Sequence, residues 1–304
     1  MLLVNRSNYN YTVVLCTYNG EQYISLLLES IINQTIAPKE IIISDDGSDD
    51  RTLSIIREFE NSVTDIIFTY LMGPRRGPSE NFIKSLSIAN SDWVFIADQD
   101  DIWVSDKVEV YFSEVELSSV PCLVFSDSTL IDHKGEIIAF SHLNSIGIYS
   151  GYIDNRIYFR NPVQGATMLL NRPMLEMILD YSSKISISDV AMYDWWIAIL
   201  SKHFGEIVFI ERPMLLYRVH SQNAIGIRKL PMCARIKNFK KILNQVCFSL
   251  KLYNKWNWLD IQKELRLSFS QIRKVGFIRY YMVYFSIKII LIYEFILKAI
   301  RLIF

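Results

Sequence analysis

Residues 93–97 form the apolar run Trp-Val-Phe-Ile-Ala, which ends directly in Asp98, Gln99, Asp100 and Asp101. A short apolar run of this kind predicts a buried strand. Carboxylates at close range repel one another and are costly to bury, and a divalent cation is the simplest compensation. Mg2+ and Mn2+ prefer oxygen ligands, typically one or two carboxylates together with phosphate oxygens of a substrate. Because ligands bind at the carboxyl ends of strands in open α/β sheets, the stretch predicts a site for a metal ion and a diphosphate.

The alternative interpretation of this acidic stretch is a loop that caps the helix after it. Either Ser105 or Asp106 stands directly before the predicted helix 107–113 and could accept the N–H groups at its start. Such a cap leaves Asp98 and Asp100 without a role. The metal site is therefore the preferred interpretation.

Around this stretch, the N-terminal third of the chain alternates between strand and helix patterns. Short apolar runs predict strands at residues 12–17, 40–44, 66–71 and 93–97, with helices predicted at 21–33, 49–60 and 82–89. Repeated strand–helix units imply right-handed crossovers and a parallel sheet. We therefore expect an α/β fold with a mostly parallel central sheet flanked by helices.

The middle of the chain has a more mixed pattern. It predicts extended segments at 122–126, 137–140, 166–170, 206–210 and 214–219, and helices at 173–180 and 193–201. Beyond about residue 225 the sequence becomes helical, basic and aromatic. This change in composition predicts two domains, residues 1–224 and a C-terminal helical extension at 225–304.

Charge is divided along the chain in a similar way, although the formal net charge of the 304 residues is zero. Residues 212–304 contain 18 Lys and Arg against three acidic residues, which leaves 14 basic and 29 acidic residues before them. A strongly basic segment usually meets an anionic partner. Because this segment is also rich in Trp, Tyr, Phe and Ile, we expect the partner to be anionic lipid and not nucleic acid.

The last part of the chain, residues 275–304, resembles a helix that lies in a membrane interface. At about 100° per residue its charged side chains fall on one half of a helix and leave the other half apolar. A transmembrane helix needs about 20 nearly uncharged residues, and the longest uncharged run, residues 280–287, has eight. The alternatives are an interface in a homo-oligomer and a helix packed on the first domain.

Polar residues follow three of the predicted strands, at 17–19, 45–48 and 98–101. The carboxyl ends of parallel strands meet at one edge of a sheet, so we expect these segments to converge. Asp46 with Gly47 is by itself a common turn signal. A carboxylate there could instead accept a hydrogen bond from a pyrimidine N–H or a ribose hydroxyl.

These motifs resemble the family 2 glycosyltransferases, which have the GT-A fold and mostly invert the anomeric centre. The resemblance covers roughly residues 11–226. The matching segments are Cys16-Thr17-Tyr18-Asn19-Gly20, Leu28-Glu29-Ser30-Ile31, Gln34-Thr35, residues 40–52 and the D-x-D element of Asp98 and Asp100. The string from Ala97 to Trp103 with Lys107, the Tyr193-Asp194-Trp195-Trp196 segment and residues 217–223 are similar to the rhamnosyltransferase-like branch.

The resemblance implies roles for residues in the first, catalytic domain. Asp100 is implied as the ligand of Mg2+ or Mn2+, with Asp98 reaching either the metal or the ribose, and His220 as a third ligand or a solvated loop histidine. Asp194 is implied as the general base, for which the alternative is a helix N-cap. The implied nucleotide- and donor-binding residues are Thr17, Tyr18, Asn19, Glu21, Asp45, Asp46, Asp98 and Gln99. The implied acceptor-binding residues are Trp195, Trp196 and Gly165, whose alternatives are core packing for the tryptophans and a simple bend for the glycine.

The resemblance implies an inverting, metal-dependent transferase that moves L-rhamnose from dTDP-β-L-rhamnose to a saccharide or lipid-linked saccharide precursor of a bacterial surface polysaccharide. A peripheral position on the cytoplasmic face of the bacterial cell membrane follows from that acceptor and from the basic C-terminal segment. One alternative is a transferase of the same fold that uses a UDP-hexose. Another is a non-catalytic, membrane-bound module that binds nucleotide sugars. An Asp-nucleophile phosphotransferase also places D-x-D after a strand, but it would want a Thr soon after the second Asp, where this chain has Asp101 and Ile102.

Overall fold

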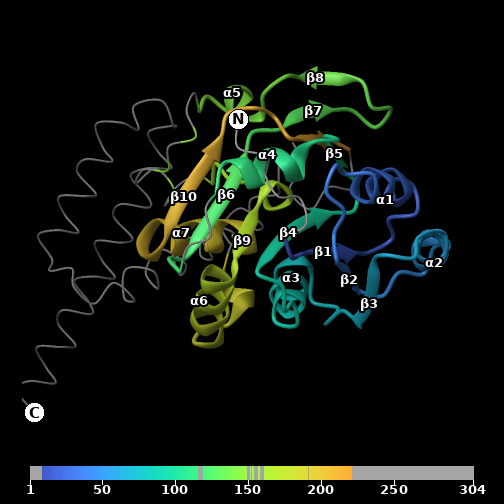
Figure 1. The fold of residues 1–304 in the computed structure, drawn as a ribbon, viewed down its shortest axis with the longest axis horizontal. Helices are drawn as coiled ribbons and strands as arrows, with labels where there is room; N and C mark the ends of the chain where they lie inside the picture. The colour runs from blue at the N-terminus through green and yellow to red at the C-terminus, as the bar shows by residue number, and fades with distance from the viewer. Residues whose placement is uncertain are drawn as a thin grey trace, which may run out of the picture. The chain divides into compact units, whose positions relative to one another are not determined.

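Two β-sheets form the framework of the part of the chain that the structure describes, residues 9–115, 119–148, 151, 153, 157, 161–190 and 192–220 (Figure 1). The structure is a computed structural model. The chain divides into two compact units, and both sheets lie in the first, which comprises Met1–Tyr152, Pro162–Ser188 and Met192–Lys229. The second unit comprises Ile153–Asn161, Asp189–Ala191 and Leu230–Phe304. The division into domains 1–224 and 225–304 stays a prediction, because residues 221–304 lie outside the described part.

The larger sheet is mostly parallel, as the sequence predicts. Its strand order is β10-β6-β9-β4-β1-β2-β3, and only β9 runs antiparallel to its neighbours, β4 and β6. The strands are β1 (Tyr11–Thr17), β2 (Glu40–Asp45), β3 (Ile67–Met72), β4 (Trp93–Asp98), β6 (Cys122–Ser126), β9 (Leu169–Asn171) and β10 (Glu206–Ile210).

The register of this sheet brings the three polar segments together. Strand β1 lies between β2 and β4, with Thr17 paired to Asp45 and Cys16 paired to Asp98. All three strands are parallel, so the residues that follow them leave the sheet at the same edge. The predicted convergence is therefore confirmed, and it follows from topology alone.

A second sheet has four strands in the order β5-β11-β7-β8. They are β5 (Ile102–Trp103), β7 (Thr129–Ile131), β8 (Ile137–Ala139) and β11 (Leu215–Arg218). Strand β5 follows the acidic stretch directly and pairs antiparallel with β11. Strand β11 ends at Arg218, two residues before His220. This sheet therefore brings the chain near residue 220 back to the end of β4.

Helices cover both faces of the larger sheet. Side chains of α1 and α4 join those of β1, β2 and β4 in one hydrophobic core. On the other face, α3 contacts β1, β2, α6 and α7. The helices are α1 (Ile24–Ile32), α2 (Thr52–Ser62), α3 (Pro78–Leu86), α4 (Lys107–Ser113), α5 (His142–Ser145), α6 (Arg172–Ser183) and α7 (Tyr193–Phe204), with 3-10 turns at Gly165–Thr167 (η3) and Ile187–Asp189 (η4).

Burial explains why the apolar runs become strands. All seven residues of β1 and the first five of β4 are buried, because helices lie on both faces of the sheet. Helix α1 buries Ile24, Leu27, Leu28 and Ile31, which have the spacing of one helix face. It begins at Ile24, three residues later than predicted, and residues 21–23 form turns before it.

The prediction of an extended segment at 166–170 is wrong in its first half. Residues Gly165–Thr167 form the turn η3, and the strand runs from Leu169 to Asn171. The carbonyl groups of Ala166 and Thr167 accept hydrogen bonds from Lys107 Nζ and Tyr111 Oη, at 2.7 and 2.6 Å. These partners lie almost sixty residues away in sequence, so no local pattern indicates them.

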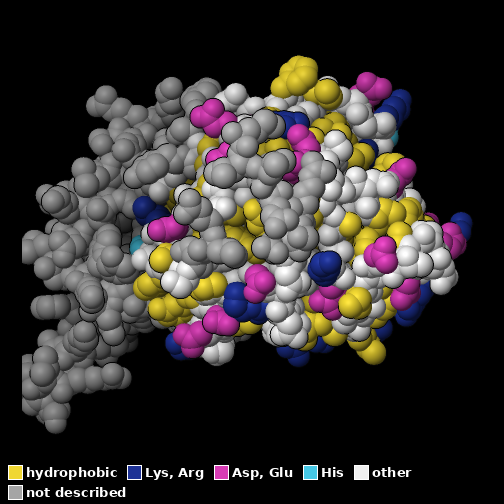
Figure 2. Space-filling model, in the orientation of Figure 1, with side chains coloured by type: hydrophobic (Ala, Val, Ile, Leu, Met, Phe, Trp, Pro, Cys, Tyr) yellow, Lys and Arg dark blue, Asp and Glu magenta, His cyan; other side chains and the backbone are white. Residues whose placement is uncertain are grey.

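Charges on the described surface are mixed in sign, and Figure 2 shows acidic and basic side chains interspersed over the visible face. Exposed ion pairs such as Arg57–Glu60 and Arg76–Glu80 contribute to this pattern. Among the helices that the structure describes, none combines the length and the apolar character that a membrane crossing requires. The basic segment and the interfacial helix predicted at 275–304 lie outside the described residues.

Candidate active site

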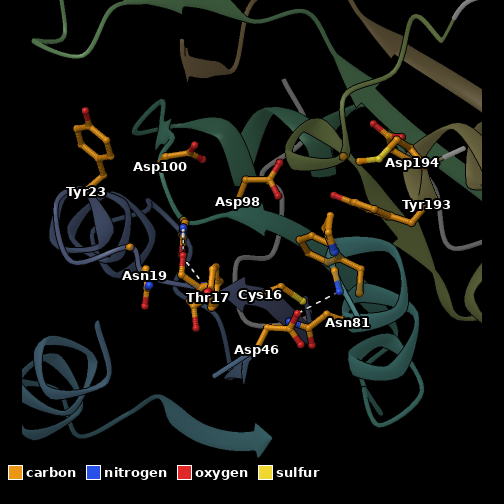
Figure 3. Close-up of a pocket in the computed structure, with 18 of the residues that line it drawn as sticks. Cys16, Thr17, Asn19, Tyr23, Asp46, Asn81, Asp98, Asp100, Tyr193 and Asp194 are labelled. Carbon is orange, nitrogen blue, oxygen red and sulfur yellow. Dashed lines mark hydrogen bonds between the residues drawn. The ribbon is translucent and has the colours of Figure 1, made fainter. Parts of the chain in front are cut away.

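A cavity of about 810 Å3 opens at the carboxyl ends of β1, β2 and β4 (Figure 3). Its wall combines these strand ends with the start of α3, the turn η3, the start of α7 and the end of β11. Ten of the predicted site residues line it: Thr17, Tyr18, Asn19, Asp46, Asp98, Gln99, Asp100, Gly165, Asp194 and His220. Segments far apart in sequence therefore meet around one space.

Asp45, predicted to bind the nucleotide, shapes the loop after β2. Its carboxylate accepts hydrogen bonds from Thr17 Oγ1 at 2.8 Å, from the backbone N–H of Gly47 at 3.0 Å, and from both the N–H and the hydroxyl of Ser48. The side chain is 7% exposed and is not among the described residues that line the cavity. The carboxylate is therefore already used in holding the loop.

Asp46, the next residue, lines the cavity and ties two loops together. Its backbone N–H donates to the carbonyl of Thr17 at 2.8 Å. Its carboxylate accepts from the backbone N–H groups of Arg75 and Gly77, at 2.5 and 3.2 Å. This arrangement places the loop between β3 and α3 beside the end of β2.

Gln99 joins the loops that follow β1 and β4. Its side-chain amide accepts from the N–H of Tyr18 and donates to the carbonyl of Tyr18, both at 2.9 Å. A Cβ on Gly20 would lie 2.4 Å from the same amide, so the close approach needs glycine. Both polar atoms of Gln99 are thus occupied by backbone, while the ring of Tyr18 is 59% exposed.

Asn19 and Glu21 hold the same region from the other side. Asn19 has a φ of 47° and bonds Ser48 and Asp49 through its N–H and its side-chain oxygen. Glu21 accepts from the N–H of Arg51 at 3.0 Å and is not among the described residues of the cavity wall. The structure therefore gives Glu21 a positioning contact and not a place in the cavity.

The acidic stretch after β4 faces His220, which the sequence left as either a metal ligand or a solvated loop residue. His220 Nε2 lies 2.7 Å from Asp100 Oδ2, and the two side chains are 12% and 16% exposed. Burial, followed by repulsion from Asp100 and Asp194, raises the pKa of Asp98 to about 8. The described residues contain no cluster of three or more metal-ligating side chains, so a cation here would rest on few protein ligands and on phosphate oxygens, as Mg2+ commonly does.

Two basic residues support the acidic stretch, and the sequence assigned a role to neither. Lys107 is fully buried and lies with Nζ 3.9 Å from the centre of the Trp103 ring. Burial lowers the pKa of Lys107 to about 7, against the raising effect of Asp101 and Asp98. Arg218 donates its backbone N–H to Asp101 Oδ1 and its Nε–H to the carbonyl of Asp100, at 3.0 and 2.9 Å.

Asp194 lies in the first turn of α7 and lines the cavity. Figure 3 shows it beyond Asp98 as seen from Asp100. The N-cap of this helix is Met192, so Asp194 is not the cap that the alternative proposed. Its Oδ1 nevertheless accepts the N–H of Trp195 at 2.6 Å. Burial raises the pKa of Asp194 to about 7, although hydrogen bonds from the backbone, including those of Trp195 and Gly165, lower it.

The predicted acceptor-binding residues separate into two groups. Trp196 is fully buried and donates its indole N–H to Ser182 Oγ at 3.1 Å, and Trp195 is 9% exposed. Burial of both rings corresponds to core packing and not to stacking on a sugar. Gly165 does line the cavity, and a Cβ there would lie 1.9 Å from Tyr193 Oη. Space for that hydroxyl is therefore the physical reason for the glycine.

Comparison with known proteins shows which family and which fold the chain is similar to. Residues 12–124 match the model of the family described as "Glycosyl transferase family 2". The chain is 29% identical over 222 residues to the dTDP-rhamnosyl transferase RfbG of Shigella flexneri. The matched region covers 70% of this chain and 73% of that protein.

Among solved structures, the chain is similar to S. aureus TarS in complex with UDP, with a TM-score of 0.54 and 17% identity. It is also similar to the mannosyltransferase PcManGT of Pyrobaculum calidifontis in complex with GDP-Man and Mn2+, with a TM-score of 0.56 and 17% identity. These matches cover 78% and 80% of this chain, which spans 65% of each of those two chains. The likeness establishes the GT-A fold.

Proposed function

Because residues 12–124 match the family 2 glycosyltransferases and the chain has the GT-A fold, we propose that the chain transfers L-rhamnose from dTDP-β-L-rhamnose with inversion. The observation that carries this proposal is the cavity whose wall holds Asp98, Asp100 and His220 together with Asp194, which Figure 3 shows beyond Asp98 as seen from Asp100. A group that grips a diphosphate and a group that takes a proton must stand on opposite sides of the reacting carbon for inversion to occur. This arrangement supplies both.

The diphosphate end of the donor lies at the end of β4 in this proposal. Asp100, with either Asp98 or His220 beside it, would hold Mg2+ or Mn2+ there together with phosphate oxygens, and the ion when bound would supply positive charge for the leaving diphosphate. The high pKa of Asp98 supports this assignment, because a carboxylate that burial and neighbouring acids destabilise gains from a cation beside it. Arg218 positions the backbone of Asp100 through the bond from its Nε.

The nucleoside end lies against the loops after β1 and β2. The exposed ring of Tyr18 offers a flat face on which a base can stack. Asp46 and Asn19 stand in the same part of the wall. Their side-chain oxygens already accept backbone N–H groups, but each oxygen has a second lone pair that can accept a base N–H or a ribose hydroxyl. Thr17, Gln99 and Asp45 keep this wall in place through the bonds described above.

Asp194 acts as the general base. Its carboxylate is held by the N–H of Trp195 and stands in the cavity opposite Asp98. There it accepts the proton of the acceptor hydroxyl while that oxygen bonds to the anomeric carbon and the diphosphate leaves. A base with a pKa near 7 combines a useful ionised fraction with a strong tendency to take the proton.

The comparisons with known proteins favour two donors. Rhamnose is favoured by the similarity to a protein named dTDP-rhamnosyl transferase. A UDP-hexose is the second candidate, favoured by the structural likeness to TarS in complex with UDP. For the acceptor we propose a lipid-linked saccharide, which the chain would reach at an anionic membrane surface.

Calorimetric titration with dTDP, UDP and GDP, each with and without Mn2+, tests the proposal. We expect metal-dependent binding that is tightest for dTDP. Tighter binding of UDP would indicate a UDP-sugar donor and leave the proposed mechanism unchanged. No binding to any nucleotide would contradict the proposal. Binding of dTDP-rhamnose without transfer to any saccharide acceptor would favour a non-catalytic binding module.

The pH dependence of turnover tests the base. Because Asp194 accepts a proton only when ionised, we expect kcat to fall about tenfold for each unit of pH below its pKa of about 7 and to level off above it. The measurement uses saturating donor, acceptor and metal, so that kcat reports the loaded enzyme. A kcat that stays constant from one unit below that pKa to one unit above it would rule out this carboxyl as the group that titrates.

A further inference from the structure

The hydroxyl of Tyr193 is buried, faces the cavity and has no hydrogen-bond partner among the described residues. Tyr193 begins α7 and is 3% exposed. Figure 3 shows its ring extending from the helix with the hydroxyl directed toward Asp98, while Asp194 projects from the same turn. Buried hydroxyls are nearly always paired, because losing water without gaining a partner is costly. An unpaired one at a cavity wall therefore indicates a ligand.

Three contacts hold this hydroxyl in place. The backbone N–H of Tyr193 donates to Ser79 Oγ at 3.1 Å. Its ring stacks on Phe82 with centroids 4.2 Å apart and planes inclined by 25°. At the far end, Gly165 leaves room for the hydroxyl, since a Cβ there would lie 1.9 Å from it. Because the ring is fixed before any ligand arrives, a bond from the hydroxyl costs little ordering.

The surroundings also determine what the hydroxyl can do. Burial, followed by repulsion from Asp98 and Asp194, raises the pKa of Tyr193 well above its ordinary value. The phenol therefore keeps its proton and can donate it to an oxygen of a ligand. A ligand hydroxyl suits this position well, because it can accept from the phenol and donate to a neighbouring carboxylate at the same time.

The position of the hydroxyl identifies the part of the ligand. Under the proposed function, the diphosphate lies by Asp98 and Asp100, and the base is Asp194. The transferred sugar is bonded to the diphosphate and presents its anomeric carbon to the acceptor at the base, so it must lie between them. Figure 3 shows the hydroxyl of Tyr193 between Asp98 and Asp194, and both carboxylates are near enough to affect its pKa.

We propose that Tyr193 Oη donates a hydrogen bond to a ring hydroxyl of the transferred sugar and so selects and positions the donor. This inference rests on the proposed function, because it takes the ligand to be a nucleotide sugar. It assigns Tyr193 to the sugar and not to the nucleotide.

Tyr193→Phe tests the inference by comparing the affinities for dTDP and dTDP-rhamnose, measured by calorimetry with Mn2+. Phe keeps the stacking on Phe82 and removes only the hydroxyl. We expect the affinity for dTDP-rhamnose to fall about tenfold, the usual loss for one hydrogen bond to an uncharged group, with the affinity for dTDP unchanged. A donor that lacks the bonded ring hydroxyl should bind the variant and the wild type equally.

Tyr11→Phe is the matched control, since Tyr11 is fully buried, bonds the carbonyl of Ile36 and lies outside the described cavity wall.

Thermal unfolding separates this role from a structural one. Because the hydroxyl is unpaired in the free protein, Tyr193→Phe should leave the unfolding temperature unchanged or raise it, whereas Tyr11→Phe should lower it. Equal affinity of wild type and variant for dTDP-rhamnose would overturn the inference, as would an equal loss for dTDP and the sugar nucleotide. If the wild type prefers UDP, the same comparison is made with UDP and a UDP-hexose. If it binds no nucleotide, the proposed function fails and the inference fails with it.

Discussion

Asp194→Asn is expected to reduce kcat by roughly 100- to 10,000-fold, the range that a general base contributes. The amide has the same shape as the carboxyl group but cannot take the proton of the acceptor hydroxyl. Its oxygen can still accept the N–H of Trp195, so the start of α7 should stay intact. Nucleotide affinity should remain unchanged, because Asp194 stands on the side of the cavity opposite to the diphosphate. The measurement is steady-state turnover beside calorimetric titration of the nucleotide.

Stability provides a second readout for this variant. Burial raises the pKa of Asp194 on folding. The folded wild-type protein therefore loses stability as the pH increases from the pKa of this carboxyl in the unfolded chain toward its value of about 7 in the folded protein. Asn carries no charge to bury, so the variant should unfold at or above the wild-type temperature at a pH above that value. Asp180→Asn makes the same change on α6, where the side chain is exposed and pairs with Lys184, and should leave turnover unaffected. Near-normal turnover in Asp194→Asn would eliminate the proposed base.

Asp100→Ala is expected to weaken nucleotide binding in the presence of Mn2+ by about 100-fold, because a bound cation contributes several kcal/mol of charge stabilisation to a diphosphate. In the absence of metal the variant and the wild type should bind alike, since the cation is then missing from both. The metal-dependent part of the affinity is thus the quantity that the experiment isolates.

Asp106→Ala is the matched control for that measurement. Asp106 lies six residues further along the chain, and its partly exposed carboxylate pairs with Arg212, which is exposed, at 2.7 Å. Exposed pairs contribute about 0–1 kcal/mol to stability, so its loss should change neither folding nor nucleotide affinity appreciably. If the Asp100→Ala variant gains as much nucleotide affinity from Mn2+ as the wild type does, Asp100 is not a ligand of the metal.

Much of the fold was predictable because its signals are local. The apolar runs of β1, β2 and β4 and the helical spacing within α1 are visible in neighbouring residues. Strand β9 and the turn η3 were misjudged because distant side chains, Lys107 and Tyr111, satisfy the carbonyl groups that a strand would have paired. The short strands β5 and β7 were missed because two- and three-residue strands carry almost no pattern.

The sequence predicted most residues of the candidate site, but not which of them line the cavity and which hold the loops in place. Asp45 and Asp46 are neighbours with the same side chain and both accept hydrogen bonds from loop backbone, yet only Asp46 lines the cavity. His220 stands 120 residues from Asp100, and only the pairing of β11 with β5 brings the two side chains together. The tryptophans after Asp194 turned inward because α7 packs on α3, α6 and two strands.

The parallel sheet, the edge at which the polar loops meet and the acidic chemistry at that edge can be inferred from the sequence, because these depend on the alternation of local patterns and on the rule that parallel strands end together. Which polar atoms remain available to a ligand becomes visible only in the folded molecule. That property depends on long-range partners: Thr17 and Ser48 occupy Asp45, Tyr18 occupies Gln99, and no described residue pairs with the hydroxyl of Tyr193. A hydrogen bond is satisfied in three dimensions, and its partner is brought into place by the fold.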